Sequence, residues 1–373
     1  MSLYYAPMCH LSGPAMRNLV RKYLPGTVCY TQMYCAKGFI NQHLLDDILP
    51  QLKDASQIIL QLYGSANSDI IAAAQMLFDK VPDLMGIDVN LGCPAPCAQK
   101  EEYGFYFKDD EAALLSQLKQ LFPQRQISAK IRLKPTLEEN LQRFQRLAAT
   151  GIDMLCVHCR KSSLSNDSSQ QEEPDYELLY QTLRQLKPSN SQFQEFGENA
   201  PEVQNKIKVV VNGGLKTQQQ INEIRSKKLG AMVGVGFLGN PSMSDFHCMQ
   251  SGKVVFHYQI SQLEMDFLVK TVEEQPNLQQ FADSYQFCNL GGEKRFRLDV
   301  AKGYQVIPCI YYLAESVLRG VFDKKEQQRQ IHLLAGKIMD GREPIEEIYG
   351  TMLGKLADVV KKFKVIGMEK EEE

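Results

Sequence analysis

Short apolar runs alternate with amphipathic stretches along the first two thirds of the chain. The runs are rich in Val, Ile and Leu and stop at Gly, Pro or Asn, which is typical of buried parallel strands. The stretches between them carry apolar residues at helical spacing. This alternation predicts an α/β fold, a TIM (β/α)8 barrel. We expect strands at 3–8, 28–31, 58–63, 86–90, 127–132, 154–158, 209–212 and 231–234, and helices at about 14–23, 69–80, 110–121, 137–150, 176–186 and 217–227.

The pattern changes near residue 243, where the strand signals stop. The stretches that follow are amphipathic at helical spacing, at 256–271, 301–322, 326–337 and 344–363. We therefore predict a catalytic barrel at 1–242, a smaller all-helical C-terminal domain at 243–368 and a charged tail at 369–373. Within the barrel, the segment at about 162–205 is rich in Ser, Gln, Asn and Glu, and we expect a polar insertion there.

Composition narrows the class of protein. With 373 residues, of which 44% are hydrophobic, the chain can build one large core and a smaller one. The formal net charge of −2 gives no sign of a polyanionic partner, so any contact with nucleic acid must use local basic patches. Ten cysteines without a secretory signal favour free thiols in a reducing compartment. No apolar run approaches the roughly 20 residues that span a bilayer. We expect a cytoplasmic or nuclear protein without a membrane partner.

The stretch 87–94 combines a buried strand with two candidate chemical groups. Asn90 lies at the C-terminal end of the predicted strand, and Cys93 lies on the loop just beyond it. In a parallel barrel this end of the strands forms the catalytic rim. An amide can hydrogen-bond a planar imide, and a thiol can deliver a proton. Taken alone, the same stretch is more typical of an inert buried cysteine on a tight turn, and the rest of the chain reverses that preference.

Polar residues also end most of the other predicted strands. Each has an ordinary structural explanation: a solvated strand end for Lys130 and Arg132, a buried core histidine for His158, and a simple turn for 212–214. Gathered at one rim, they indicate a site for a planar, anionic cofactor. The strand-end residues are Met8, Gln61, Asn90, Lys130, His158, Asn212 and Gly234.

The loops after the last two predicted strands favour phosphate. Both Asn212-Gly213-Gly214 and Gly234-Val235-Gly236 contain glycines, which let backbone N–H groups approach phosphate oxygens closely. Lys130, with His158 beside it, is placed to neutralise charge on one edge of a flavin ring, and Gln61 to hydrogen-bond its imide edge. A Gly-x-Gly-x-x-Gly motif for a resident nicotinamide does not open the first βαβ unit.

We expect no metal site. Cys156 and Cys159 form a Cys-x-x-Cys, and Cys93 and Cys97 lie four residues apart. A structural zinc site usually needs a second matched pair in a loop, whereas Cys156 lies in a predicted strand.

Taken in order, these motifs resemble those of the tRNA-dihydrouridine synthases, flavin enzymes that reduce uridine in tRNA to 5,6-dihydrouridine. The resemblance covers residues 6 to about 241 well and the helical region loosely. Its 29–31 and Tyr103-Gly104 elements are similar to those of the eukaryotic branches acting on D-loop positions 16/17 or 20a/20b. The matching stretches are 6–8, 29–33, 61–64, 88–94, 103–104, 130–132, 157–158 with Arg160, 212–213 and 236–241.

The resemblance implies a role for each of these positions. Cys93 would be the catalytic acid, and Asn90 would hold the target base together with Arg132 and Arg160. Two positions depart from the usual pattern, with Cys159 in place of Gly and Val235 in place of Arg. The residues that would hold FMN are Pro7, Met8, Gln61, Lys130, His158, Asn212, Gly213, Gly214, Gly234, Val235 and Gly236.

The implied reaction transfers hydride from N5 of FMN to C6 of a D-loop uridine and a proton from Cys93 to C5, with NADPH re-reducing the flavin. The uridine must be flipped out of folded tRNA to reach the barrel. We expect a monomer whose helical domain grips the body of the tRNA through Lys294, Arg295 and Arg297, with a second basic cluster at 361–364. Two alternatives stay open: an FMN barrel oxidoreductase acting on a small molecule of dihydroorotate or enoate type, and a catalytically silent RNA-binding relative.

Overall fold

The computed structural model describes residues 2–8, 12–41, 44–52, 55–161, 173–186 and 207–237. The chain divides into two compact units, one comprising residues 1–12 and 26–234 and the other residues 13–25 and 235–373. The predicted helical domain, both basic clusters and most of the predicted polar insertion lie outside the described residues. Described parts of the second unit are helix α1, Pro14–Tyr23, which matches its prediction, and the 3-10 helix Val235–Phe237.

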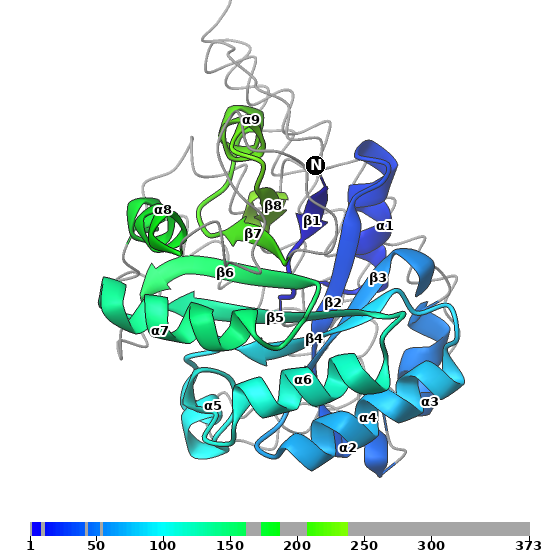
Figure 1. Ribbon diagram of the computed structural model, residues 1–373. Helices are drawn as coiled ribbons and strands as arrows, with labels where there is room; N and C mark the ends of the chain where they lie inside the picture. The colour runs from blue at the N-terminus through cyan, green and yellow to red at the C-terminus, as the bar shows by residue number, and fades with distance from the viewer. Residues whose placement is uncertain are drawn as a thin grey trace, which may run out of the picture. The chain divides into compact units, whose positions relative to one another are not determined.

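The first unit is a closed barrel of parallel strands in the order β1 to β8 (Figure 1). Every neighbouring pair is parallel, including β8 with β1, which closes the ring. The predicted TIM barrel is therefore confirmed. The strands are β1 Leu3–Tyr5, β2 Val28–Cys35, β3 Ile58–Tyr63, β4 Gly86–Leu91, β5 Gln126–Leu133, β6 Met154–Lys161, β7 Lys208–Asn212 and β8 Gly230–Val233.

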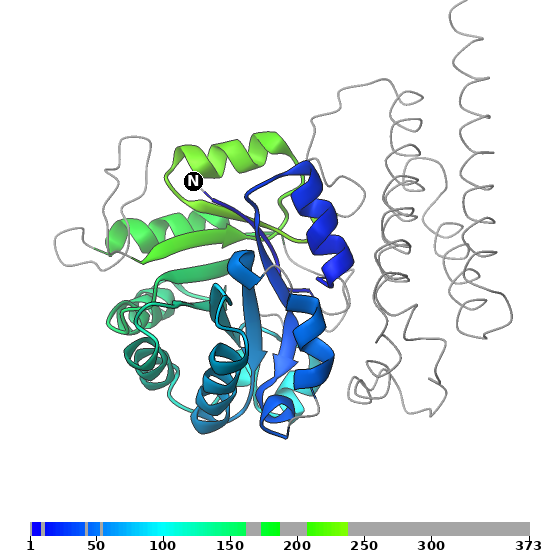
Figure 2. The same ribbon diagram turned by 90° about the vertical axis from the view of Figure 1, so that its right-hand side faces the viewer.

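Helices run along the outside of the strands (Figures 1 and 2). Their starts follow the expected chemistry of helix capping, since the Asp110 carboxylate accepts the N–H groups of Ala112 and Ala113. Within the described ranges, no helix is long and apolar enough to cross a membrane. The helices predicted from the pattern are α4 Asn67–Lys80, α6 Glu111–Leu121, α7 Leu137–Ala148, α8 Tyr176–Gln185 and α9 Gln218–Ser226.

The structure corrects the length of β1. The strand ends at Tyr5, whereas the apolar pattern predicted its end at Met8. Ala6 N–H still donates to Val233 O at 2.8 Å, but the next backbone groups bond to the Ser12 side chain instead of to a neighbouring strand. Its Oγ donates to Ala6 O at 2.6 Å and accepts Met8 N–H at 2.9 Å. These two bonds replace a strand ladder with a turn, so Pro7 and Met8 belong to a loop at the rim.

Several short elements carried no clear pattern in the sequence. Strand β2 continues four residues beyond its predicted end at Thr31, through a change of register between Tyr30 and Met33. The others are single turns, too short to show helical periodicity. They are α2 Ala36–Ile40, α3 Leu45–Ile48, α5 Pro96–Lys100 and the 3-10 helices Leu49–Leu52, Ala55–Gln57 and Gly104–Tyr106.

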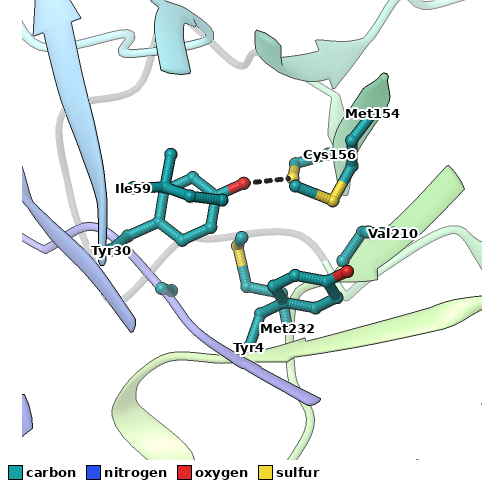
Figure 3. Packing of buried hydrophobic residues seen from close by; sticks show 8 residues of the cluster. Tyr4, Tyr30, Ile59, Met154, Cys156, Val210 and Met232 are labelled. Carbon is teal, nitrogen blue, oxygen red and sulfur yellow. Dashed lines mark hydrogen bonds between the residues drawn. The ribbon is translucent and has the colours of Figure 1, made fainter. Parts of the chain in front are cut away.

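The barrel interior holds a cluster of apolar side chains contributed by several strands (Figure 3). The rings of Tyr4 and Tyr30 meet edge to face with centroids 6.4 Å apart. The Tyr30 hydroxyl lies 3.3 Å from Cys156 Sγ, so this cluster ends at polar atoms. We call the following residues the apolar cluster: Tyr4, Ala6, Tyr30, Ile59, Met154, Cys156, Val210 and Met232.

Candidate active site

Strand pairing brings the predicted polar residues together at the C-terminal ends of β4 to β7. Asn90 pairs with Lys130, and Arg132 pairs with His158, which pairs in turn with Asn212. Neighbouring strands lie about 4.8 Å apart, so these side chains form one continuous row. We call these five residues the polar rim. The row contains cationic groups and amides, as the strand-end pattern predicted.

The loop that carries Cys93 is held by side chains of the polar rim and by the following loop. Asn90 Oδ1 accepts the N–H groups of Gly92 at 3.2 Å and Cys93 at 3.0 Å. Arg132 Nε donates to Gly92 O at 3.1 Å. Phe105 N–H donates to Cys93 O at 3.0 Å. These bonds fix the backbone on both sides of the thiol, which is half-buried.

Gly104 lets the following loop approach Cys93 closely. It adopts a φ of +63°, in the left-handed region that favours glycine. A Cβ at this position would lie 2.8 Å from Cys93 O and 2.9 Å from Cys93 Cβ, which is closer than real contacts allow. Glycine is therefore required here on two grounds, backbone conformation and space.

The Cys93 thiol stays protonated at neutral pH. Burial raises its pKa above the usual value, and the Cys97 thiol adds to that effect. The cations Arg132 and Lys130 pull in the other direction without reversing the shift. A thiol rather than a thiolate can act as a general acid, as the proposed role of this residue requires.

Lys130 and Asp88 titrate abnormally because little water surrounds them. Loss of hydration, and then the Arg132 charge, lower the pKa of Lys130 to about 8. Burial raises the pKa of Asp88 to about 6, against the opposing effects of Ser128, Gln61 and Lys130. Near neutral pH the site therefore keeps a positive Lys130 beside a negative Asp88, in surroundings where charge interactions are strong.

His158 is neutral. Burial, followed by the charges of Lys130, Arg132 and Arg160, moves its pKa well below the usual value. Arg160 Nη1 lies 3.1 Å from His158 Nε2. Because a guanidinium only donates, Nε2 must be the acceptor and Nδ1 must carry the proton. The ring therefore offers one N–H group, with a cation on its other side.

The Asn212-Gly213-Gly214 loop packs against that histidine. Gly213 and Gly214 have φ values of +114° and +69°, and a Cβ on Gly213 would lie 2.9 Å from His158 Cδ2. Asn212 Nδ2 donates to Met232 O at 2.8 Å, and the Tyr176 hydroxyl donates to Gly213 O. The loop is thus a tight backbone turn beside the polar rim, with the Asn212 amide turned toward β8.

The first and last strands contribute the remaining predicted positions. Pro7 and Met8 are half-buried after β1, and Met8 Sδ lies 3.1 Å from where a Cβ on Gly234 would be. Val235 and Gly236 follow directly in the chain, but they belong to the second compact unit.

Gln61, expected at the flavin ring, is almost fully buried and already hydrogen-bonded. Its Nε2 donates to Asp88 Oδ2 at 2.7 Å, and its Oε1 accepts from Asn90 Nδ2 at 3.0 Å. These bonds use one of the two N–H groups on Nε2, and the second is available to a cofactor.

The family model described as "Dihydrouridine synthase (Dus)" matches residues 4–286, well over half of the 373 residues. The chain belongs to the dihydrouridine synthase family. The resemblance read from the sequence motifs is thereby confirmed.

Curated relatives of this chain act, by name, at different positions of tRNA. A human tRNA-dihydrouridine(20a/20b) synthase [NAD(P)+]-like protein is 26% identical over 64% of this chain and 69% of its own length. A tRNA-dihydrouridine(20) synthase [NAD(P)+] of Saccharomyces cerevisiae is 27% identical over 52% and 47%. A rat tRNA-dihydrouridine(16/17) synthase [NAD(P)(+)]-like protein is 29% identical over 42% and 36%. Identities this similar do not favour any one position.

In this dihydrouridine synthase family member, sequence reasoning missed a set of polar residues beneath the rim. Asp88 accepts from Ser128 Oγ at 2.6 Å, and Ser128 Oγ lies 3.3 Å from the Tyr30 hydroxyl. A signal was present: Asp88 precedes Asn90 by two residues, and Ser128 precedes Lys130 by two. Alternation along a strand therefore points both pairs to the barrel interior.

Cysteines of the described ranges show no metal chemistry. All six are free, and no three His, Cys, Asp or Glu side chains there come together as a metal site would require. Cys156 and Cys159 are both fully buried in β6, but Cys156 points toward Tyr30, whereas Cys159 Sγ lies 3.6 Å from Val157 O. Their Cys-x-x-Cys spacing follows from the strand and not from a shared ligand.

Proposed function

We propose that this protein reduces a uridine in the D-loop of tRNA to 5,6-dihydrouridine, with Cys93 as the proton donor. The observation that carries the proposal is a half-buried Cys93 whose thiol stays protonated, on a rigid loop at the catalytic rim of a barrel of this family. The relatives named for the same reaction on tRNA support the choice of substrate. Sequence identity to these relatives does not single out one uridine position.

The donor set of the rim fits a flavin with one phosphate, which we propose to be FMN. Lys130 supplies a cation, His158 supplies a neutral N–H, and the backbone turn at Gly213 carries no side chain of its own. When bound, the flavin supplies the hydride that reduces C6 of the uracil ring. Pro7 and Met8 are the proposed neighbours of its ring, and Gly234 belongs to the second proposed phosphate loop. NADPH is the proposed reductant, in line with the NAD(P) of the relatives' names.

The chain's own residues account for the other half of the reaction. Asn90 Oδ1 and Arg132 hold the Cys93 loop, so the thiol need not search for its position. Negative charge that develops on the uracil O4 would be met by the cations at the rim, Lys130, Arg132 and Arg160. The proton of Cys93 Sγ then passes to C5, and the thiolate left behind is stabilised by Arg132 and Lys130.

The experiment that tests this function is anaerobic reoxidation of the reduced protein. Purified full-length protein should carry FMN, lose its flavin absorbance on addition of NADPH, and regain it when tRNA lacking dihydrouridine is added. Free uridine should not restore the absorbance, because the base must be presented by the folded tRNA. Reoxidation by free small molecules but not by tRNA would refute the proposal and favour the small-molecule oxidoreductase.

We also propose that residues 243–368 grip the tRNA, with Lys294, Arg295 and Arg297 contacting its phosphates. Replacing all three by Gln should weaken tRNA binding and make its salt dependence shallower, without altering reduction by NADPH. Unchanged tRNA affinity at low and moderate salt would exclude this cluster from the interface.

A further inference from the structure

A chain of hydrogen bonds leads from a fully buried carboxylate to the loop of the proposed acid. Gln61 Nε2 donates to Asp88 Oδ2 at 2.7 Å, and Asn90 Nδ2 donates to Gln61 Oε1 at 3.0 Å. Cys93 N–H donates to Asn90 Oδ1 at 3.0 Å. Asp88 itself has no exposed surface, and Gln61 is 1% exposed. Each of the two amides therefore uses its oxygen and its nitrogen within the same chain.

The direction of these bonds is determined at the two ends. An ionised carboxylate only accepts hydrogen bonds and a backbone N–H only donates, whereas an amide can be turned around. Asp88 requires the N–H face of Gln61, which leaves Gln61 Oε1 to accept from Asn90. Asn90 must then present Oδ1 to the Cys93 loop. Rotating Gln61 by 180° would place its carbonyl against the carboxylate and leave two oxygens facing each other.

The other groups around Asp88 are compatible with its acceptor role. Ser128 Oγ donates to Asp88 Oδ1 at 2.6 Å, and Lys130 provides the nearby positive charge. Tyr30 and Cys156 are the other titratable groups affected by Asp88, and burial raises the pKa of each, so both stay protonated. Figure 3 shows the Tyr30 hydroxyl turned toward Cys156. Among the described residues, Gln61 donates to Asp88 Oδ2 and Ser128 donates to Asp88 Oδ1.

We propose that Asp88 is a positioning residue, which acts through Gln61 and Asn90 to hold the backbone of the Cys93 loop in one orientation. The inference rests on the proposed function only in taking Cys93 as the acid. It assigns a role to a buried carboxylate whose hydrogen bonds go to Gln61 and Ser128 rather than to the Cys93 loop itself. Such a charge is costly to bury, and its presence is explained if it fixes the orientation of the Gln61 amide. Gln61 then supports the orientation of Asn90, which is also held by the Cys93 N–H group and by the contact of its Nδ2 with Met33 Sδ at 3.4 Å.

The test is amide hydrogen exchange of Gly92 and Cys93 in the purified full-length protein, resolved by fragmentation. Asp88→Leu removes the acceptor, and exchange at both amides should become at least tenfold faster. Asp88→Asn keeps a carbonyl for Gln61, and exchange should stay within about threefold of the unsubstituted protein. The amide of Tyr103, bonded to Ala98 O at 3.0 Å, serves as an internal reference.

Two further variants separate positioning from general stability. Ser128→Ala removes the other hydrogen bond of the same carboxylate and should leave the Gly92 and Cys93 amides protected. Gln61→Met breaks the same series of hydrogen bonds at its next member and should speed exchange at both amides as Asp88→Leu does. It therefore provides the test if the Asp88→Leu variant folds poorly. In the Gln61→Met background, replacing Asp88 by Leu as well should add nothing.

The rate of thiol alkylation gives a second measurement of how firmly the Cys93 loop is held. Cys93 should react several-fold faster in the Gln61→Met variant, while Cys97, whose Sγ lies 3.2 Å from the Tyr103 hydroxyl, keeps its rate. Unchanged exchange at Gly92 and Cys93 in Gln61→Met would overturn the proposal, as would equal acceleration by Ser128→Ala. Because no measurement here uses flavin or tRNA, these outcomes do not depend on whether the protein reduces uridine.

Discussion

Two groups of side chains in the barrel interior come from the same alternating strands but hold different chemistry. One is the apolar cluster, in which Ile59, Val210 and Met232 are fully buried. The other is the polar rim, where Lys130, Arg132 and His158 stand on adjacent strands. Burial stabilises the first group, whereas it perturbs the titration of the second. Stability and reactivity thus rest on different side chains of the same strands.

The largest expected effect concerns the rim. Replacing Cys93 by Ala should slow dihydrouridine formation by about 10²–10⁴-fold, since a positioned general acid is lost, while flavin content and reduction by NADPH persist. Rapid-mixing measurement of flavin reoxidation by tRNA would show this. Cys97→Ala is the matched control, and its rate should stay close to that of the unsubstituted protein. If Cys97→Ala stops turnover and Cys93→Ala does not, the acid has been misassigned.

In the apolar cluster, Ile59→Ala should lower the free energy of unfolding by about 2–5 kcal/mol, because it leaves a cavity among fully buried side chains. Denaturant titration measures this. The exposed Ile40, at 37% of its surface, is the control, and Ile40→Ala should cost little. At temperatures where the Ile59 variant is folded, its flavin reoxidation should be near normal. A large loss of rate in the folded variant would contradict the division of roles between the apolar cluster and the polar rim.

The hydrogen-bond network of Asp88 should affect the pH dependence of the protein's stability. Asp88 has a folded pKa of about 6 against an ordinary value of 3.8, so between these values the folded protein keeps a proton that the unfolded chain has released. This group's contribution to stability is therefore full at low pH and is lost as the pH rises through about 6. The loss amounts to at most about 3 kcal/mol.

Asp88→Asn lacks that titration. Its stability relative to the unsubstituted protein should therefore increase between about pH 4 and pH 6.5 and level off above. Denaturant titrations across this range give the difference directly, and Lys130, whose pKa is about 8, does not titrate within it. Parallel pH profiles for the two proteins would show that Asp88 titrates normally.

The smallest effect is expected for the flavin. Lys130→Gln removes a cation next to the proposed ring and should weaken FMN binding by about tenfold, or about 1.4 kcal/mol. Titration of the flavin-free protein with FMN measures it. Lys134→Gln is a suitable control, because Lys134 lies over the Phe105 ring at 4.4 Å from its centroid. FAD rather than FMN in the purified protein would contradict the proposed cofactor.

The sequence was most informative where a physical rule acts locally. Apolar runs ending at Gly or Asn located the strands, and the predicted helix at 110–121 begins at Asp110, whose side chain bonds the N–H groups of its own first turn. The Ser12 turn that ends β1 early depends on a side chain four residues from the backbone N–H that it captures. The short helices between β2 and β3 are single turns without a periodic pattern.

Candidate residues were predicted at the rim but not beneath it. Lys130 and His158 stood out because polar residues are conspicuous at the end of an apolar strand. Asp88 lay inside such a strand, and its role appears only when Gln61 of β3 and Ser128 of β5 are brought beside it. Hydrogen bonds between strands that are far apart in sequence depend on the register of strand pairing, which an amino-acid sequence does not state directly.

Mapping dihydrouridine in tRNA tests the central claim most directly. tRNA from cells lacking this protein should have lost dihydrouridine at one D-loop position, and purified protein with NADPH should restore it at that position. The Cys93→Ala variant should fail to restore it, whereas Cys97→Ala should succeed. An unchanged dihydrouridine map in the deficient cells, together with no conversion of uridine in tRNA by the purified flavoprotein, would contradict the account.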